Sequence, residues 1–340
     1  MIKKFFAIFL ATLVGLVISE ISLRLIGIKP WKYVTTNDSI SGKKIFKDDS
    51  ILGWIATEEE YKIYPADQRE KTFNLSIGKS GERKTGLDRK NFDKEFLIVG
   101  GSFTQGWGVN DEETFSAKLE KKYSDIKVHN YGQGGYGTVQ SALLLEREII
   151  KKKLSELVIY GFIEHHEYRN VARHNWMRTL EMYSQRGTTK TPYGIINDQN
   201  KLILKKPVFY VNFPFKENLS LITLIEKVYS KNRSKKGFPR DSERKKQQKI
   251  VTEKTILKMK KIAEKNNSDF LVIILDYMNK YNIENYEKFF KNNQINFVNC
   301  AIPLIDEMVL IGDYHPSQKG HSHYSECLYD YIESEIENNF

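Results

Sequence analysis

The chain has 340 residues, of which 40% are hydrophobic and 28% are charged. This length and balance exclude a largely disordered chain and predict one large domain with additions. The net charge is +10, and a Lys/Arg-rich run over 231–249 carries much of the excess. No zinc-finger spacing or nucleic-acid-binding motif accompanies the charge, so we interpret the run as a solvated helix face or linker and expect no nucleic-acid partner.

The first residues predict a membrane anchor. Lys3 and Lys4 precede an uncharged, mostly apolar stretch over 5–19, and apolar residues continue beyond Glu20. A basic end followed by an apolar run is typical of a secretion signal, but no small-x-small cleavage site stands out after it. We therefore predict an uncleaved signal anchor over 1–27, with the lysines in the cytoplasm and the rest of the chain outside. A cleaved signal peptide and a buried soluble helix are the alternatives.

The next segment, 28–91, predicts a loop-rich leader with a few strands, because turn residues are frequent and periodicity is weak. From residue 92 onward, short apolar runs alternate with helical patterns. The predicted strands are 95–99, 126–130, 157–160, 270–275 and 295–299, and the predicted helices are 114–123, 138–153, 219–229, 242–265 and 316–337. Such alternation is typical of a mostly parallel sheet covered by helices, which predicts an α/β three-layer sandwich over 92–340.

Residues 164–250 interrupt the alternation. The runs 193–196 and 202–211 predict a hairpin around 197–200, and we interpret the segment as a lid-like insertion over the sheet edge. Two cysteines, Cys300 and Cys327, lie in the C-terminal part. They form no CxxC or Cys/His cluster, which argues against structural zinc; a disulfide and two buried thiols both remain open.

One serine and one Asp/His pair carry the chemistry. The apolar run 96–99 breaks into two glycines and Ser102, as a buried strand does when it ends at a tight turn that presents a hydroxyl. Near the C-terminus, Asp313 and His315 stand two residues apart and precede a proline. A serine hydroxyl becomes a nucleophile when a base removes its proton, and a carboxylate orients that base. The three residues are the minimum set for acyl transfer through a serine ester, although each can also be a plain cap or turn residue.

The order and surroundings of these residues resemble the SGNH (GDSL-like) hydrolase family. The family's first block is Gly-Asp-Ser, and here Ser102 matches the nucleophile while Gly101 replaces the aspartate. Residues 130–137 resemble the second block, which implies that the N–H of Gly135 helps to form an oxyanion hole. The family usually spaces its late Asp and His by three; the spacing of two between Asp313 and His315 resembles membrane-anchored and sugar-acetylating members. The resemblance covers roughly 92–340 and implies a flavodoxin-like fold.

The family's third block normally supplies an asparagine side chain as a further oxyanion donor. In this chain Ile163 stands where that asparagine belongs. Because the segment after it follows the same strand end, we predict that Asn170 is the substitute, with His165 or His166 as the fallback.

Two other kinds of site receive little support. Gly132, Gly134 and Gly137 match the bare GxGxxG spacing, but no acidic residue closes the next strand where a ribose-binding carboxylate belongs, so we expect no cofactor. His321 and His323 are two residues apart on a predicted helix and so point to different faces, which argues against a metal site.

The sequence thus predicts a membrane-anchored, extracytoplasmic serine esterase or O-acyltransferase. Its expected substrate is an acyl ester, with acetyl as the expected group, on an envelope or secreted glycan. Water as second substrate gives hydrolysis, and a sugar hydroxyl gives transfer. The rival from another class is a non-catalytic glycan-binding or assembly protein on a degenerate scaffold, which Gly101 and Ile163 motivate. The sequence leaves the oligomeric state open.

Overall fold

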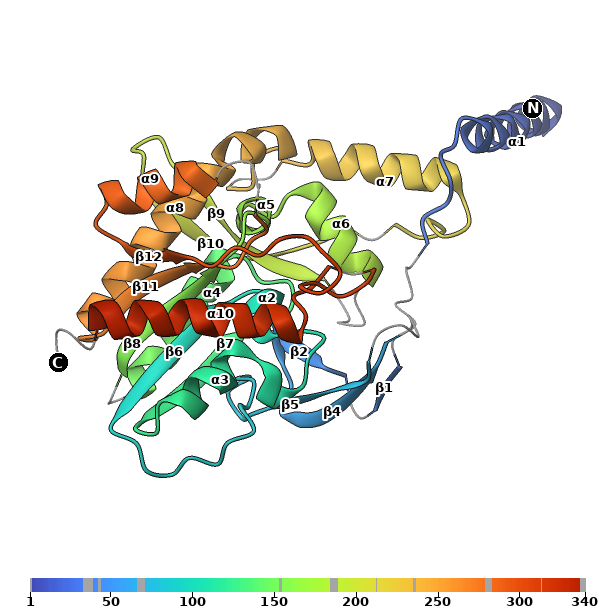
Figure 1. The fold of residues 1–340 in the computed structure, drawn as a ribbon. Helices are drawn as coiled ribbons and strands as arrows, with labels where there is room; N and C mark the ends of the chain where they lie inside the picture. The colour runs from blue at the N-terminus through green and yellow to red at the C-terminus, as the bar shows by residue number, and fades with distance from the viewer. Residues whose placement is uncertain are drawn as a thin grey trace.

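The computed structural model describes residues 2–32, 39–41, 44–65, 71–152, 155–183, 189–211, 213–234, 237–278, 283–312 and 314–336. A five-stranded parallel sheet of order β12-β11-β8-β6-β7 forms its centre (Figure 1). The strands are β6 (Lys94–Gly100), β7 (Ile126–Gly132), β8 (Ser155–Phe162), β11 (Asp269–Ile274) and β12 (Asn296–Asn299). All five lie where the apolar runs predicted strands, and the α/β class is confirmed.

Helices cover both faces of the sheet. On one face lie α3 (Phe115–Lys122) and α10 (Gln318–Tyr331), and on the other α4 (Thr138–Glu148), α8 (Asp241–Lys265) and α9 (Ile283–Asn292). Strand β6 serves both layers because successive side chains of a strand point to opposite faces: Phe96 and Ile98 join one core cluster, and Leu97 and Val99 the other. The three-layer sandwich is therefore confirmed.

The N-terminal part consists of a helix and a small β-structure. Helix α1 (Ile2–Leu25) projects from the body (Figure 1), has a mean hydropathy of 2.2 over its most apolar window, and is long enough to cross a bilayer. The leader forms short antiparallel strands around its own apolar cluster, which holds Tyr61, Ile63 and Leu75. These strands are β1 (Ser39–Ser41), β2 (Phe46–Asp49), β3 (Gly53–Ala56), β4 (Glu59–Tyr64) and β5 (Phe73–Ile77).

The insertion contains α5 (His166–Asn170), α6 (His174–Tyr183), the hairpin β9 (Lys190–Ile196) with β10 (Leu202–Phe209), and α7 (Ser220–Asn232). The predicted hairpin is present. It packs on α4 and α8 through contacts around Val139 and Val251, so it lies over the helical layer and not over the sheet edge that the sequence suggested. The small apolar cluster there is what fixes this position. Short helical turns complete the chain: α2 (Ser102–Gln105), η1 (Asp111–Glu113), η2 (Ile149–Lys151) and η3 (Ile332–Ile336).

A disulfide joins Cys300 to Cys327, with Cα atoms 5.8 Å apart. It ties the chain just after β12 to α10, and it decides the alternative that the sequence left open. Disulfides persist in oxidising compartments, in agreement with a domain outside the cytoplasm.

Candidate functional site

Three glycines stand side by side at the carboxyl ends of neighbouring strands. Gly100 of β6 pairs in register with Gly132 of β7 and Gly161 of β8. A Cβ at Gly100 or Gly161 would lie 2.1 Å from the Thr104 hydroxyl, and one at Gly132 would lie 2.3 Å from the backbone N of Gln105. The absent side chains therefore let the short turn α2 sit directly on the ends of three strands.

Asn130 fixes that turn from the side of β7. Its side-chain amide donates to the carbonyl of Thr104 at 2.8 Å and to the Ser116 hydroxyl at 2.9 Å, and its Oδ1 accepts from the N–H of Gly132. Since Asn130 is fully buried, these bonds are shielded from water and hold α2 firmly. Ser102, the first residue of α2, is positioned by this arrangement.

The Ser102 hydroxyl meets an imidazole from the far end of the chain. Oγ of Ser102 lies 2.8 Å from Nε2 of His315, across a separation of 213 residues. The His315 ring also packs edge-on against Phe103, with ring centroids 5.5 Å apart. A base within hydrogen-bond distance of a serine hydroxyl is the geometry that activates the oxygen as a nucleophile.

A tight turn presents His315. The N–H of Leu310 donates to the carbonyl of His315 at 2.8 Å, and the N–H of Tyr314 donates to the carbonyl of Leu310 at 3.2 Å. Tyr314 has a positive φ of 61° and its carbonyl accepts a hydrogen bond from the Tyr277 hydroxyl. Asp313, the third predicted catalytic residue, lies outside the described residues.

Two backbone N–H groups near the Ser102 hydroxyl have no hydrogen-bond acceptor among the described residues. Within the described part of the chain, neither the N–H of Ser102 nor that of Gly135 donates a hydrogen bond. Gly135 has φ +83°, a conformation that favours glycine, and it sits in the turn after β7. The neighbouring carbonyl of Tyr136 lies 3.3 Å from the position that a Cβ of Gly101 would take, so this turn adjoins the residue before Ser102.

The leader holds the same turn. The indole N–H of Trp54 donates to the carbonyl of Gly134 at 3.2 Å, and the Tyr136 hydroxyl donates to the carbonyl of Trp54. Gln133 binds two further leader groups, the N–H of Ala56 and the carbonyl of Gly81. The leader is thus part of the structure that positions Gly135, which its loop-rich sequence did not predict.

The side chains of His166 and Arg169 occupy the space beside Gly101. A Cβ at that position would lie 2.8 Å from Nε2 of His166 and 3.4 Å from Nη1 of Arg169. An aspartate does not fit there unless these groups move, which is a physical reason for the glycine. Arg169 donates to the carbonyl of Tyr136 at 2.9 Å and lies 4.5 Å from the ring centre of Trp176. No carboxylate within the described ranges forms an ion pair with it.

Asn170 is committed elsewhere. It is fully buried; its Oδ1 accepts from the N–H of Val139, and its amide donates to the hydroxyls of Thr138 and Thr252 at 2.9 and 2.7 Å. Both amide protons are therefore used, and none remains for an oxyanion. The prediction for Asn170 is corrected accordingly: it joins α5 to α4 and α8.

The same hydrogen bonds set the tautomer of His166. Thr138 accepts from Asn170, its hydroxyl lies 2.7 Å from that of Tyr160, and the Tyr160 hydroxyl lies 2.7 Å from Nδ1 of His166. Each hydroxyl finds an acceptor when the chain of donation runs from Thr138 through Tyr160 to Nδ1, which leaves the proton on Nε2. Burial, together with nearby Arg169, lowers the pKa of His166 well below its usual value, so the ring is neutral.

The Nε2–H of His166 is a buried donor without a hydrogen-bond partner among the described residues. It points to the space beside Gly101, the residue before Ser102. Ile163, at the family's asparagine position, is buried in the core, and His165 is half-buried against Tyr168. Of the two fallback histidines, His166 is the one that the structure places against the block of Ser102.

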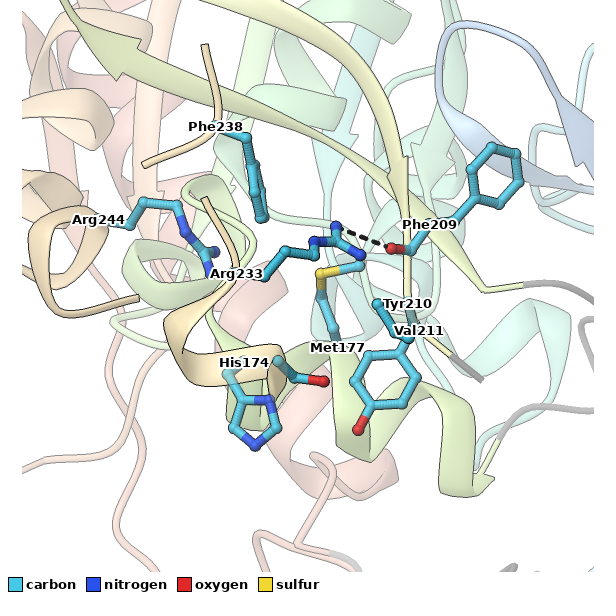
Figure 2. A pocket seen from close by; sticks show the side chains of 9 residues that line it. His174, Met177, Phe209, Tyr210, Val211, Arg233, Phe238 and Arg244 are labelled. Carbon is cyan, nitrogen blue, oxygen red and sulfur yellow. Dashed lines mark hydrogen bonds between the residues drawn. The ribbon is translucent and has the colours of Figure 1, made fainter. Parts of the chain in front are cut away.

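A small pocket lies inside the insertion, apart from Ser102 and His315. His174 and Tyr210 face each other across it, and Arg233 donates to the carbonyl of Phe209 at 3.1 Å (Figure 2). Burial lowers the pKa of His174 to about 4, so this ring is neutral at physiological pH. The sequence contained no motif for this pocket, because its lining comes from four separate elements.

The role of Arg169 was also not apparent from sequence. Its position beside Gly101 depends on α5 folding back against the turn after β7, which is a tertiary contact. The one available signal was its place in the aromatic and charged run that begins the insertion.

No protein-family model matches the chain, and no curated protein sequence matches it. Among solved structures, it is similar to a member of the lipolytic protein G-D-S-L family from Veillonella parvula, with 10% identity, a TM-score of 0.39, and coverage of 71% of this chain and 99% of that one. It is also similar to a GDSL-like lipase from Bacteroides thetaiotaomicron, with 14% identity, a TM-score of 0.38, and coverage of 72% of this chain and 90% of that one. A catalytic mutant of an acetylxylan esterase from Geobacillus stearothermophilus has 12% identity and a TM-score of 0.38, with coverage of 72% of this chain and 96% of that one. At such identities the likeness is one of fold.

Proposed function

We propose that this chain is a serine ester hydrolase or O-acyltransferase that α1 holds at the outer face of a membrane. The observation that carries the proposal is the 2.8 Å approach between Oγ of Ser102 and Nε2 of His315. The approach joins two sequence blocks that were singled out for this chemistry, and it occurs at the carboxyl end of a parallel sheet, where active sites of open α/β folds form.

The proposed ester chemistry uses Ser102 and His315 as follows. Oγ of Ser102 attacks the acyl carbonyl carbon while Nε2 of His315 takes the hydroxyl proton. The ester C–O bond then breaks, His315 returns the proton to the leaving alkoxide, and an acyl-serine remains. Water or a sugar hydroxyl attacks that ester with the same histidine as base, which frees Ser102. In this proposal Asp313 orients the imidazole.

The developing oxyanion needs donors aimed at it. The N–H groups of Ser102 and Gly135, which donate no hydrogen bond within the described ranges, suit that role, and Arg169 adds positive potential beside them. One lost donor of this kind costs roughly 3–4 kcal/mol of barrier. Arg169 offsets the asparagine that this chain lacks by binding the Tyr136 carbonyl, which helps to keep the two N–H groups in place. The Nε2–H of the neutral His166 lies beside Gly101 as a further buried donor.

We infer the substrate class from the proposed location. Lys3 and Lys4, at the start of the apolar helix α1, favour a cytoplasmic N-terminus and so an envelope-side domain, and we propose acetyl esters of envelope glycans as the substrates. The competing function is a non-catalytic glycan-binding or assembly protein. Its supporting observation is that Asn170, the expected side-chain amide, is fully engaged elsewhere.

A labelling experiment with full-length protein separates the two functions. We expect a fluorophosphonate probe to label the wild type and Ser322→Ala, whose hydroxyl only donates to the carbonyl of Gln318, and to leave Ser102→Ala unlabelled. Ser102→Ala and His315→Ala should each lower the turnover of a chromogenic acetyl ester on the order of a thousandfold or more.

Unchanged melting temperatures in Ser102→Ala and His315→Ala would assign these losses to chemistry rather than to folding. Absence of labelling in the folded wild type would instead favour the glycan-binding protein.

A further inference from the structure

Helix α7 has its polar side buried and its apolar side exposed. Ser220, Thr223 and Glu226 have no exposed surface, and Ser230 is 8% exposed. These residues recur every three to four positions, so they form one stripe along the helix. The stripe faces the insertion: Glu226 pairs with Arg178 at 3.5 Å, and Ser230 lines the pocket of Figure 2. A surface helix of a soluble domain has the opposite arrangement.

The outward stripe is apolar. Ile225, Val228 and Tyr229 are 43%, 52% and 46% exposed, and they lie at helical spacing opposite the polar stripe. Phe215 and Leu219, which precede the helix, extend the apolar surface with exposures of 69% and 39%. Contiguous exposed apolar surface of this kind marks an interaction site.

The start of α7 is joined to the end of α1. The carboxylate of Glu20 accepts the N–H groups of Ser220 and Leu221 at 2.9 and 3.0 Å, which caps α7 with a side chain from the anchor. Arg24 donates to the carbonyl of Asn218 at 2.8 Å. Figure 1 shows the C-terminal end of α1 close to the N-terminal end of α7, away from the sheet.

The linker after α1 strengthens this junction. The N–H of Trp31 donates to the carbonyl of Lys216 and to the Thr223 hydroxyl, both at 2.9 Å, and the Lys216 ammonium lies 3.6 Å from the centre of the buried indole ring. The anchor and α7 are therefore connected by specific contacts at Glu20, Arg24 and Trp31.

The junction lies at the depth of the bilayer surface. With Lys4 at the inner boundary of the hydrocarbon core, a helical rise of 1.5 Å per residue places Glu20 about 24 Å and Arg24 about 30 Å further along the axis. The hydrocarbon core is about 30 Å thick, so Arg24 reaches its outer boundary and Glu20 lies about one helical turn below it. The start of α7, which Arg24 and Glu20 contact, then lies within about one helical turn of this boundary.

We propose that the outward face of α7, made of Ile225, Val228 and Tyr229, lies in the outer interface of the membrane that α1 crosses. The partner is a lipid surface, with the apolar stripe among the upper acyl chains and Lys227 and Lys231 directed to anionic headgroups. The proposal goes beyond the esterase function and rests on the insertion of α1.

The test uses full-length protein in vesicles of phosphatidylethanolamine and phosphatidylglycerol that contain nitroxide-labelled lipid. Single cysteines for an environment-sensitive fluorophore replace Val228 on α7, Phe9 in α1 and Lys121, an exposed residue of α3. The native cysteines are paired in a disulfide and do not react. We expect shallow nitroxides to quench most of the fluorescence at 228, deep nitroxides to quench it at 9, and neither to affect 121.

Each other outcome overturns the proposal. If lipid nitroxides quench the fluorophore at position 9 but the fluorophore at position 228 is exposed to water, α1 is inserted and α7 does not lie in the interface. A label at 228 that is shielded from water but not quenched by lipid shows that a second copy of the chain covers α7. A label at 9 that escapes quenching refutes the anchor itself, and none of these results bears on the esterase chemistry.

A variant with polar outward residues gives an independent test. In Ile225→Gln/Val228→Gln/Tyr229→Gln, we expect an unchanged melting temperature because the replaced side chains are exposed. A fluorophore at Leu219→Cys should then lose most of its lipid quenching, whereas the control change Lys121→Gln, on the exposed surface of α3, should leave quenching intact. A large drop in melting temperature would mean that these residues pack inside the protein, contrary to the proposal.

Discussion

Gly101 replaces the aspartate of the resembled family, and this replacement depends on His166. The imidazole takes the space where a side chain at 101 would begin, and Tyr160 holds that ring through Nδ1. The resembled family has an aspartate at this position, and here a neutral ring and a guanidinium fill the corresponding volume. We therefore expect a larger residue at position 101 to be tolerated only when His166 is also replaced by a smaller one.

A double-mutant cycle tests this dependence. We expect Gly101→Asp to lower both the melting temperature and the ester turnover, because its Cβ meets Nε2 at 2.8 Å. Adding His166→Ala should restore much of both, since it removes the ring and lets the new carboxylate pair with Arg169. Neighbouring residues of this kind typically show coupling of about 0.5–3 kcal/mol. Additive effects in the cycle, measured by thermal unfolding and acetyl-ester kinetics, would show that the two positions are independent.

The candidate site was predictable at the residue scale where its signals are local. Ser102 and His315 stand next to turn residues that the sequence displays, and their proximity is confirmed by the structure. Asn170 was misassigned because its partner Thr252 is 82 residues away, and no local pattern records such a bond. Asp313 and the catalytic roles stay predictions.

At the scale of elements, the row formed by Gly100, Gly132 and Gly161 makes the site possible. The three residues lie in register on adjacent strands, and α2 rests on all of them. The obstacles that a methyl group would meet differ, however. At Gly132 it meets the backbone of α2, which cannot rotate away, whereas at Gly161 it meets side chains, the nearest being the Thr104 hydroxyl.

This difference predicts unequal rescue. Gly132→Ala should lower turnover and stability by the 1–3 kcal/mol typical of overpacking, with no single compensating change. Gly161→Ala should be similarly damaging alone but largely relieved by Thr104→Ala, which deletes the hydroxyl 2.1 Å away. Thr104→Ala alone is the control and should cost little, because that hydroxyl is buried without a hydrogen-bond partner in the described part of the chain. If Thr104→Ala rescued Gly132→Ala as well as Gly161→Ala, the α2 backbone would not be what a methyl group meets at Gly132.

Elements were predicted well where one periodicity dominates. Strands β6, β7 and β8 of the central sheet are buried apolar runs with glycines at or near their ends, so their positions along the chain could be predicted from the sequence. The periodicity of α7 predicted a helix, but it could not reveal which stripe faces the protein, because an amphipathic pattern is the same when inverted. The leader strands are short and alternate weakly, so they were expected only in outline.

At the scale of the whole molecule, buried histidines make stability depend on pH. Burial lowers the pKa of His321 to about 3 and, with Arg169 nearby, lowers the pKa of His166 well below its usual value. The unfolded chain protonates these rings near pH 6.5, and the folded chain does not. The unfolded state therefore binds more protons below that pH, so the free energy of unfolding is greatest above it and falls on acidification.

We expect each such histidine to contribute a slope of up to about 1.4 kcal/mol per pH unit below pH 6.5. Urea unfolding at pH 7 and pH 5 measures it. His321→Gln should flatten the pH dependence by up to one proton, and His323→Gln, on the same helix but only half-buried, is the matched control. A stability that rises on acidification from pH 7 to pH 5 would show that the rings are charged in the folded protein.

The disulfide between Cys300 and Cys327 bears on when the chain becomes reactive. Its 27-residue span contains His315, so oxidation closes the loop that carries the base. Ser102 leaves the ribosome 213 residues before that histidine, and the cytoplasm keeps thiols reduced. Ser102 and His315 therefore come together only after the C-terminal part of the chain has been made, and the disulfide then fixes the loop that carries His315.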